Sequence, residues 1–90
     1  MADHVEVSRQ AERDLGRLPR DQRERIRVIL AELVADPPRA NLDIAPLTDR
    51  QPHLRLRIGS LRVILRPTAE GYVAIRVVDR RDFERAARLH

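Results

Sequence analysis

Arginine alternates with apolar residues in the segment from residue 54 to 66, which reads LRLRIGSLRVILR. Gly59-Ser60 separates the two alternating runs, and a two-residue loop that starts with glycine favours a type II′ hairpin turn. Counting outward from this turn sets Arg57 directly opposite Arg62 on one face of the hairpin. Like charges in that position destabilise a sheet by roughly a few tenths of a kcal/mol. The pattern therefore indicates that something compensates for the repulsion.

Two explanations of this basic face stay open. Arg55, Arg66 and His53 lie on the same face by parity. A polyanion such as a phosphodiester backbone would suit the planar, two-pronged guanidinium groups. Alternatively, the face is a solvated surface of an arginine-rich protein, where salt screens the repulsion. The opposite face is apolar and should cover a core, and its residues are Leu54, Leu56, Ile58, Leu61, Val63 and Leu65.

The charge of the chain is unevenly distributed along the sequence. All 18 basic residues are arginine, and the net charge is +4. Residues 1–52 hold nine arginines and ten acidic residues, whereas residues 53–90 hold nine arginines and four acidic residues. The second part is thus the expected contact surface for an acidic partner. Tyr72 and Phe83 are the only aromatic residues, which argues against a platform that stacks bases.

Composition also narrows the class of protein. The 90 residues contain no cysteine, and the three histidines have no metal-ligand spacing, so the sequence predicts no disulfide, no metal site and no cofactor. No apolar run reaches membrane-spanning length, and the first residues lack the apolar core of a signal peptide. We expect a single domain over residues 1–90 that is cytoplasmic and makes no membrane contact.

The elements before the hairpin are a strand and two helices. His4 to Val7 alternates as a short strand does, and Ser8 can cap the helix that follows it. Pro19 ends this first helix, and an apolar stripe at helical spacing predicts a second helix that stops before Asp36-Pro37. The stripe consists of Ile26, Ile29, Leu30, Leu33 and Val34. The two helices should pack as a hairpin on the apolar face of the sheet.

The remaining segments complete an α+β fold with an antiparallel sheet of about four strands. Residues 37–52 contain four prolines and should connect irregularly, held to the core by Leu42, Ile44 and Leu47. Residues 72–78 should form a third meander strand. Simple alternation puts Val73, Ile75 and Val77 on one face of that strand and Arg76 on the other, with the basic surface. The pattern around Phe83 and Ala86 predicts a short C-terminal helix.

This order of motifs resembles the RelE/ParE superfamily of toxins from type II toxin–antitoxin modules, with the RelE-like branch favoured. The resemblance covers nearly the whole chain. Its motifs are A-x-x-D-L-x-x-L-P at residues 11–19, D-P at 36–37, P-L at 46–47, L-R-x-G-S-L-R-V-I at 56–64 and V-x-R-R at 78–81.

The resemblance implies a toxin that cleaves mRNA on the ribosome by transesterification. In that chemistry a base removes the proton of the ribose 2′-OH and cations stabilise the phosphorane. Arg55, Arg57 and Arg62 match the basic positions of the family's central hairpin, and Arg80, or else Arg81, matches the arginine after the last strand. The full phosphate-binding surface that we expect consists of Arg55, Arg57, Arg62, Arg66, Arg76 and Arg81. The implied partner is a cognate antitoxin, in a hetero-oligomeric complex.

The sequence departs from the family at the proton carrier. RelE-like members usually have a tyrosine where this chain has Phe83 or Glu84. Arginine cannot serve as the base near neutral pH, so the candidates are His53, Glu84 and the terminal His90. Each has a simpler reading, as a surface residue, a helix ion-pair partner and a frayed end, respectively.

Two other functions therefore remain open. A ParE-like toxin would inhibit DNA gyrase and cut nothing, and the missing tyrosine favours this alternative. A catalytically weak member could instead be kept for antitoxin binding.

Overall fold

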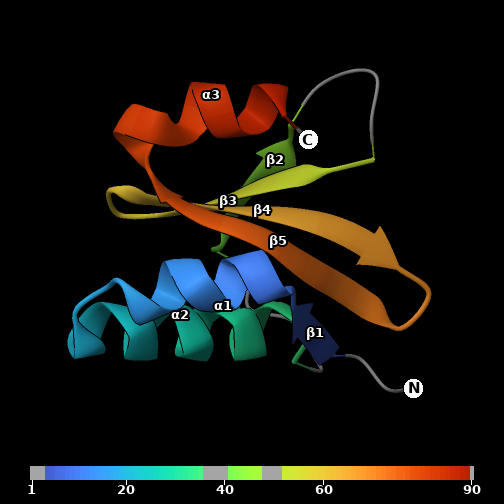
Figure 1. The fold of residues 1–90 in the computed structure, drawn as a ribbon. Helices are drawn as coiled ribbons and strands as arrows, with labels where there is room; N and C mark the ends of the chain where they lie inside the picture. The colour runs from blue at the N-terminus through green and yellow to red at the C-terminus, as the bar shows by residue number, and fades with distance from the viewer. Residues whose placement is uncertain (1–3, 36–40, 48–51, 90) are drawn as a thin grey trace.

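The computed structural model describes residues 4–35, 41–47 and 52–89, which form a five-stranded sheet with helices on both faces (Figure 1). The elements are β1 (His4–Val7), α1 (Arg9–Gly16), α2 (Arg20–Leu33), β2 (Asp43–Pro46), β3 (Leu54–Ile58), β4 (Leu61–Thr68), β5 (Gly71–Asp79), the 3₁₀ turn η1 (Arg80–Asp82) and α3 (Phe83–Arg88). The strand order is β1-β5-β4-β3-β2. Only β1 and β5 pair in parallel among the described strands. The predicted α+β class is confirmed, with five strands in place of about four.

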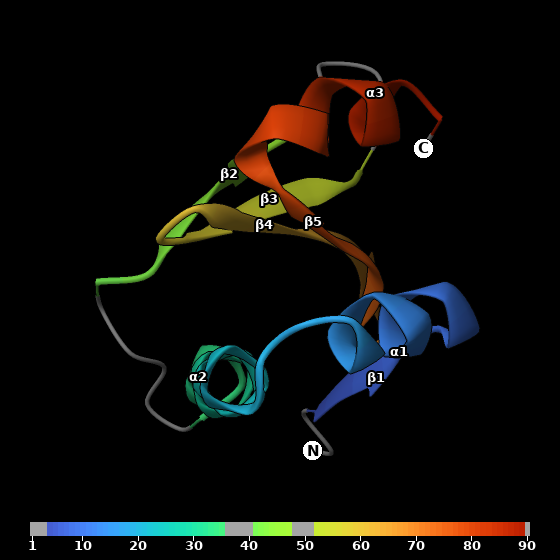
Figure 2. The ribbon, with the colours of Figure 1, turned by 60° about the vertical axis from the view of Figure 1, so that its left-hand side comes forward.

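The helical hairpin forms where the sequence predicts it. The Ser8 hydroxyl accepts a hydrogen bond of 3.1 Å from the backbone N–H of Ala11, as an N-cap does. Pro19 then separates α1 from α2. The helices pair side by side beneath the sheet (Figure 2). Within the described ranges, no helix combines the length and the apolar character that crossing a membrane requires.

The main core lies between this helical hairpin and the sheet. Ala11 and Leu15 of α1 and Ile26 and Leu30 of α2 are buried against it. The sheet contributes the buried residues Leu56, Ile58, Leu61, Val63, Leu65, Ala74 and Val77. Every apolar hairpin residue predicted to cover a core is in this cluster or packs against it. The helical hairpin thus leaves the arginine face of the sheet uncovered.

The central hairpin has the predicted register. Ile58 pairs with Leu61, Arg57 with Arg62, Leu56 with Val63 and Leu54 with Leu65. Gly59 has a φ of 59°, and no described residue other than glycine has a positive φ, a combination that fits a type II′ turn. The turn therefore fixes which side chains share a face.

The proline-rich connection contains a strand that the sequence did not predict. Residues 43–46 form β2, which pairs antiparallel with β3 and sets Asp43 opposite Arg57. The expected contacts of this segment are nevertheless present, since Leu42 and Ile44 pack on the main core and Leu47 packs on the other face. β2 is an edge strand, and Pro46 at its end fits that position because proline cannot donate to a central ladder.

Strand β5 contains a bulge that overturns the predicted alternation. Ile64 pairs with Arg76 and Leu65 with Ala74, so Ile75 is an extra residue on β5. Val77 packs with the main core, whereas Ile75 packs on the opposite face. The prediction that these two residues share a face is therefore wrong.

Helix α3 covers part of the opposite face, where the sequence predicts a short terminal helix. Ile64, Val78 and Ala86 form a second buried cluster, with Phe83 packed against it. Figure 1 shows α3 on the side of the sheet away from α1 and α2. Because Ile64 lies between Arg62 and Arg66 on β4, the arginine face is part apolar platform and part open basic surface.

Candidate functional site

The hairpin brings two of the predicted arginines together directly. Arg57 and Arg62 are cross-strand neighbours, and Arg55 lies two residues from Arg57 on the same face of β3. The Arg62 guanidinium donates to the carbonyls of Gly59 and Leu61, at 2.8 and 2.9 Å. These bonds hold Arg62 against the hairpin turn and fix where its charge lies.

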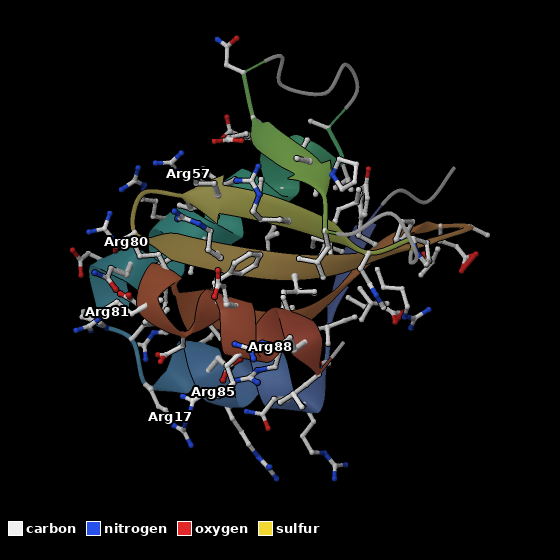
Figure 3. All side chains as sticks on the ribbon, turned by 90° about the horizontal axis from the view of Figure 1, so that it is seen from above. Arg17, Arg57, Arg80, Arg81, Arg85 and Arg88 are labelled. Carbon is white, nitrogen blue, oxygen red and sulfur yellow. The ribbon has the colours of Figure 1, made fainter. Side chains whose placement is uncertain are left out.

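The turn after β5 brings a third element to the same place. The backbone N–H of Arg80 donates to the Ser60 carbonyl at 2.8 Å, which ties η1 to the hairpin turn. The Asp79 side chain accepts from the N–H of Arg81 at 2.9 Å and so caps η1. Figure 3 shows Arg57 and Arg80 at the same end of the sheet. We name Arg55, Arg57, Arg62 and Arg80 the arginine cluster.

The electrostatics of Arg62 reflect this crowding. Partial burial and then the positive charges of Arg57, Arg55 and Arg80 lower the pKa of Arg62 from its usual value. Arginine still stays protonated near neutral pH because its ordinary pKa exceeds about 12. The cluster is therefore a group of mutually repelling cations held in place by backbone structure, which is a suitable receptor for a phosphate group.

One carboxylate lies inside the cluster, and no local pattern in the sequence indicates it, because its position depends on the pairing of β2 with β3. Asp43 Oδ1 is 3.4 Å from Arg55 Nη2, and Asp43 Oδ2 is 3.8 Å from Arg57 Nη1. Its negative charge acts to raise the pKa of Arg62, against the effect of the neighbouring arginines. Half of the Asp43 side chain is exposed. Only the strand pairing reveals this proximity, since 12 and 14 residues separate Asp43 from its partners.

The predicted proton carriers lie at the margins of the cluster. His53 precedes β3, and its backbone carbonyl accepts from the N–H of Leu47 at 2.9 Å. Glu84 is exposed in the first turn of α3. Phe83, which stands in the region of the family's tyrosine, packs into the second cluster. His90 lies outside the described residues.

The other predicted phosphate contacts are more dispersed. Arg66 is exposed on β4, four residues beyond Arg62. Arg81 is 83% exposed in its side chain and pairs with Asp79 at 3.2 Å. Figure 3 shows Arg81 beside Arg80. Both residues therefore extend the basic surface outward from the cluster.

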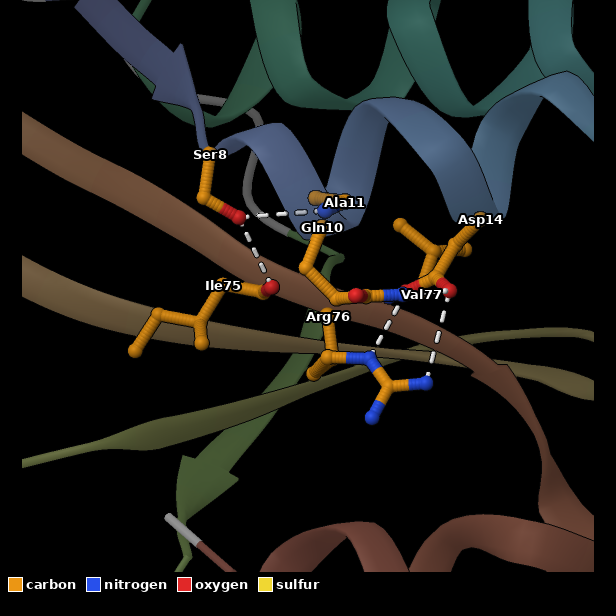
Figure 4. Close-up of polar contacts among 7 residues, drawn as sticks. All are labelled: Ser8, Gln10, Ala11, Asp14, Ile75, Arg76 and Val77. Carbon is orange, nitrogen blue, oxygen red and sulfur yellow. Dashed lines mark hydrogen bonds and ion pairs between the residues drawn. The ribbon is translucent and has the colours of Figure 1, made fainter.

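The Arg76 side chain points toward helix α1 and contacts Asp14 there. Its Nε and Nη2 donate to the two Asp14 oxygens at 2.9 and 3.3 Å (Figure 4). Asp14 also accepts from the Val77 N–H at 2.9 Å and from Gln10 at 3.1 Å. Burial acts to raise the pKa of Asp14, but the hydrogen bonds from Arg76, Val77 and Gln10 outweigh it, so the pKa lies below its usual value.

The position of Asp14 explains what this network does. Strand β1 pairs with β5 only as far as Ala74. Beyond that point, the Ser8 N–H donates to the Ala74 carbonyl at 3.0 Å and the Ser8 hydroxyl to the Ile75 carbonyl at 2.9 Å. The Asp14 carboxylate then accepts the hydrogen bond of the Val77 N–H. Helix α1 thus replaces the missing strand along the bulged edge of β5 (Figure 4).

No metal-binding arrangement is found in the described parts of the chain. There, no group of three or more histidine, aspartate or glutamate side chains is placed to hold a metal ion.

Comparison with known proteins identifies the fold. No protein-family model and no curated protein sequence matches the chain. Solved structures do match it. The chain superposes on one from the RelB–RelE antitoxin–toxin complex of Methanococcus jannaschii with a TM-score of 0.76 and 22% identity, covering 91% of this chain and 98% of that one.

Two further complexes give the same result. The archaeal RelE–RelB complex of Pyrococcus horikoshii OT3 matches with a TM-score of 0.72 and 25% identity, covering 89% of this chain and 97% of that one. The toxin–antitoxin complex RelBE2 of Mycobacterium tuberculosis matches with a TM-score of 0.69 and 21% identity, over 88% and 99%. The chain therefore has the RelE-like fold, as the resemblance in the sequence predicts.

Proposed function

We propose that this protein is a toxin of the RelE type whose arginine cluster binds the phosphodiester backbone of mRNA. The observation that carries the proposal is the convergence of four arginines from β3, β4 and η1. Their mutual repulsion opposes folding, yet the hairpin turn, the bonds of Arg62 and the Arg80–Ser60 bond hold them together. A bound phosphate group offsets that repulsion with its negative charge, so phosphate binding explains why four arginines are held together.

The proposed reaction is a metal-independent endonucleolytic cleavage of mRNA on the ribosome. The ribose 2′-oxygen attacks the adjacent phosphorus, and the guanidinium groups stabilise the negative charge of the phosphorane. Arg62 is the best placed for this role because it lies between Arg57 and Arg80 and its guanidinium is fixed to the turn. Arg66 and Arg81 extend the track for neighbouring phosphates.

The proposed partner is a cognate antitoxin. Two of the solved structures described above are complexes of RelE with RelB, and the third is the toxin–antitoxin complex RelBE2. By analogy, we propose that an antitoxin neutralises this chain in a hetero-oligomeric complex in the cytoplasm. The basic cluster suits an antitoxin segment that carries acidic side chains.

The direct test is a primer-extension map of cellular mRNA after brief induction of the chain without antitoxin. We expect new 5′ ends at codon-phased positions with the wild type. Arg62→Ala should reduce them by about 10²- to 10³-fold, the usual effect of removing one group that stabilises transition-state charge. Arg20→Ala, an exposed arginine at the start of α2, is the matched control and should cleave normally. Full cleavage by Arg62→Ala would show that the cluster is not the site.

One observation favours a second candidate function. Phe83 packs into the second cluster and carries no proton to donate, so this chain lacks the tyrosine of RelE-like members. A ParE-like toxin that inhibits DNA gyrase needs no proton carrier, and neither does a weakly active member retained for antitoxin binding. Intact transcripts together with an induced DNA damage response would support the gyrase inhibitor. Intact transcripts with normal growth would support the antitoxin-binding member.

A further inference from the structure

The carboxylate of Asp43 is placed where the proposed reaction needs a base. The register of β2 on β3 sets Asp43 directly opposite Arg57, and its two oxygens lie 3.4 Å from Arg55 Nη2 and 3.8 Å from Arg57 Nη1. Its side chain is 50% exposed, so a ribose can reach it. A base must lie within hydrogen-bond reach of the hydroxyl whose proton it removes, and a phosphate bound by these arginines carries that ribose next to Asp43.

The other two candidates are less well placed. His53 lies just before β3, two residues from Arg55 and four residues from Arg57, which places it about 13 Å from Arg57 along the backbone. Glu84 lies on α3 beyond η1 and follows Arg80 by four residues. Asp43 is directly opposite Arg57, and its negative charge acts to raise the pKa of Arg62. Asp43 thus contacts two arginines of the cluster at once, one with each carboxylate oxygen.

We propose that Asp43 is the general base of the cleavage reaction, an inference that rests on the proposed ribonuclease activity. Its carboxylate takes the proton of the 2′-OH while the bond between the 2′-oxygen and phosphorus forms. The bond between phosphorus and the 5′-oxygen breaks, and the leaving oxygen takes a proton from water. The products are a 2′,3′-cyclic phosphate and a 5′-hydroxyl, and Asp43 returns its proton to solvent.

The ion pairs of the free protein fit this role. Arg55 and Arg57 bind the carboxylate when no substrate is present. An incoming phosphate competes for the same guanidinium groups, because arginine binds phosphate and carboxylate with the same planar geometry. Asp43 then exchanges a guanidinium for the ribose hydroxyl. Substrate binding itself thereby frees the base at the place where it acts.

A simpler role for Asp43 makes the opposite prediction. If Asp43 is only a counter-ion that reduces repulsion among the arginines, its neutral form leaves a more positive surface. RNA should then bind more tightly and be cleaved at least as fast. If Asp43 is the base, Asp43→Asn should still bind RNA at least as tightly, yet cleavage should fall by about 10²- to 10⁴-fold. Binding and cleavage therefore separate the two roles.

The experiment measures both quantities on the full chain. Single-turnover cleavage of a defined mRNA on programmed ribosomes is compared among wild type, Asp43→Asn, Asp43→Glu, Arg62→Ala and the Arg20→Ala control. Binding is measured with a short single-stranded RNA whose 2′-hydroxyls are replaced by hydrogen, so that it cannot be cleaved. Thermal unfolding confirms that each variant is folded. We expect Asp43→Asn to bind and not cleave, and Asp43→Glu to recover part of the rate.

A second neutral variant guards against a misfolded Asp43→Asn. Asp43→Ala should be cleavage-deficient, and added formate should restore part of its rate, whereas formate should not help Arg62→Ala. Normal or faster cleavage by a neutral variant overturns the assignment of the base and leaves the ribonuclease proposal intact. Loss of RNA binding in folded Asp43→Asn also overturns it. Absence of cleavage by wild type and Arg20→Ala overturns the ribonuclease proposal, and the inference with it.

Discussion

Two aspartates in this protein pair with arginines, and their surroundings differ sharply. Asp14 is 4% exposed in its side chain and accepts hydrogen bonds from Arg76, the Val77 N–H and Gln10. Asp43 is 50% exposed and lies 3.4 Å and 3.8 Å from two guanidinium groups. The first carboxylate is saturated with short bonds to its own fold. The second makes longer contacts and stays open to solvent.

The difference separates a structural ion pair from one that is available for binding. Removing one partner of a buried pair leaves an uncompensated charge and unpaired backbone groups, which is strongly destabilising. An exposed pair contributes little, since water and salt replace it readily. Arg76, which is bound to a buried carboxylate, therefore stabilises the fold. Under the proposed function, Arg55 and Arg57 exchange their carboxylate for a phosphate group.

The largest expected effect tests the buried side of this comparison. Asp14→Ala removes the partner of Arg76 and leaves the Val77 N–H without its acceptor, so we expect a loss of about 3 kcal/mol in the free energy of unfolding. Urea denaturation followed by circular dichroism measures it. Asp43→Ala is the matched control and should change stability by less than about 1 kcal/mol. Equal losses in both variants would contradict the distinction.

A double-mutant cycle should resolve the pairs themselves. Asp14 and Arg76 share two hydrogen bonds at 2.9 and 3.3 Å, so we expect a coupling free energy of about 1–3 kcal/mol. The cycle uses Asp14→Asn, Arg76→Gln and the double variant. For the exposed pair, the cycle of Asp43→Asn with Arg57→Gln should give about 0.5 kcal/mol or less. A larger coupling for Asp43 and Arg57 would mean that their contact is structural.

The site and the fold were predictable from the sequence to different degrees. The hairpin register follows from Gly59-Ser60 and a period of two, because both act locally. The strand β2 and the bulge at Ile75 depend on neighbouring strands, and no local pattern in residues 43–46 or 72–78 encodes them. The faces predicted for Val73 and Ile75 are therefore wrong, whereas Arg76 and Val77, which follow the bulge, lie on the faces predicted for them. Asp43 was missed for the same reason, because its approach to Arg55 depends on that strand pairing.

Asp14 illustrates a different gap. It belongs to a motif that the sequence does display, A-x-x-D-L-x-x-L-P, and α1 was predicted correctly. Its partners Arg76 and Val77 are 62 and 63 residues away. Helical periodicity places Asp14 on a helix but does not reveal that the edge of β5 needs an acceptor there. An acidic residue within an otherwise apolar helix face is the one signal that could have indicated a buried partner.

A smaller effect should appear in the pH dependence of stability. The pKa of Asp14 in the folded protein lies below its ordinary value, which is about 3.9 in an unfolded chain. Its contribution is thus complete above the unfolded value and is lost as the pH falls through the folded value. Thermal melts between pH 7 and pH 3 should show a shallower decline below about pH 5 in Asp14→Asn than in wild type. A decline of unchanged steepness in Asp14→Asn would show that Asp14 is not the group that titrates. Asp79, whose pKa the Arg81 N–H lowers, accounts for part of the remaining decline.

The smallest expected effect concerns which arginines meet a phosphate backbone. Each basic side chain that neutralises a phosphate on single-stranded nucleic acid contributes about 0.7 to the slope of log affinity against log salt. Arg57→Gln should therefore flatten the slope for a single-stranded RNA by about that amount. Arg76→Gln should leave the slope unchanged, because Asp14 holds this guanidinium at the edge of β5. A slope that flattens equally in Arg76→Gln would place Arg76 on the RNA-binding surface, as the sequence pattern predicts. It would also mean that a buried carboxylate gives up its partner as readily as an exposed one.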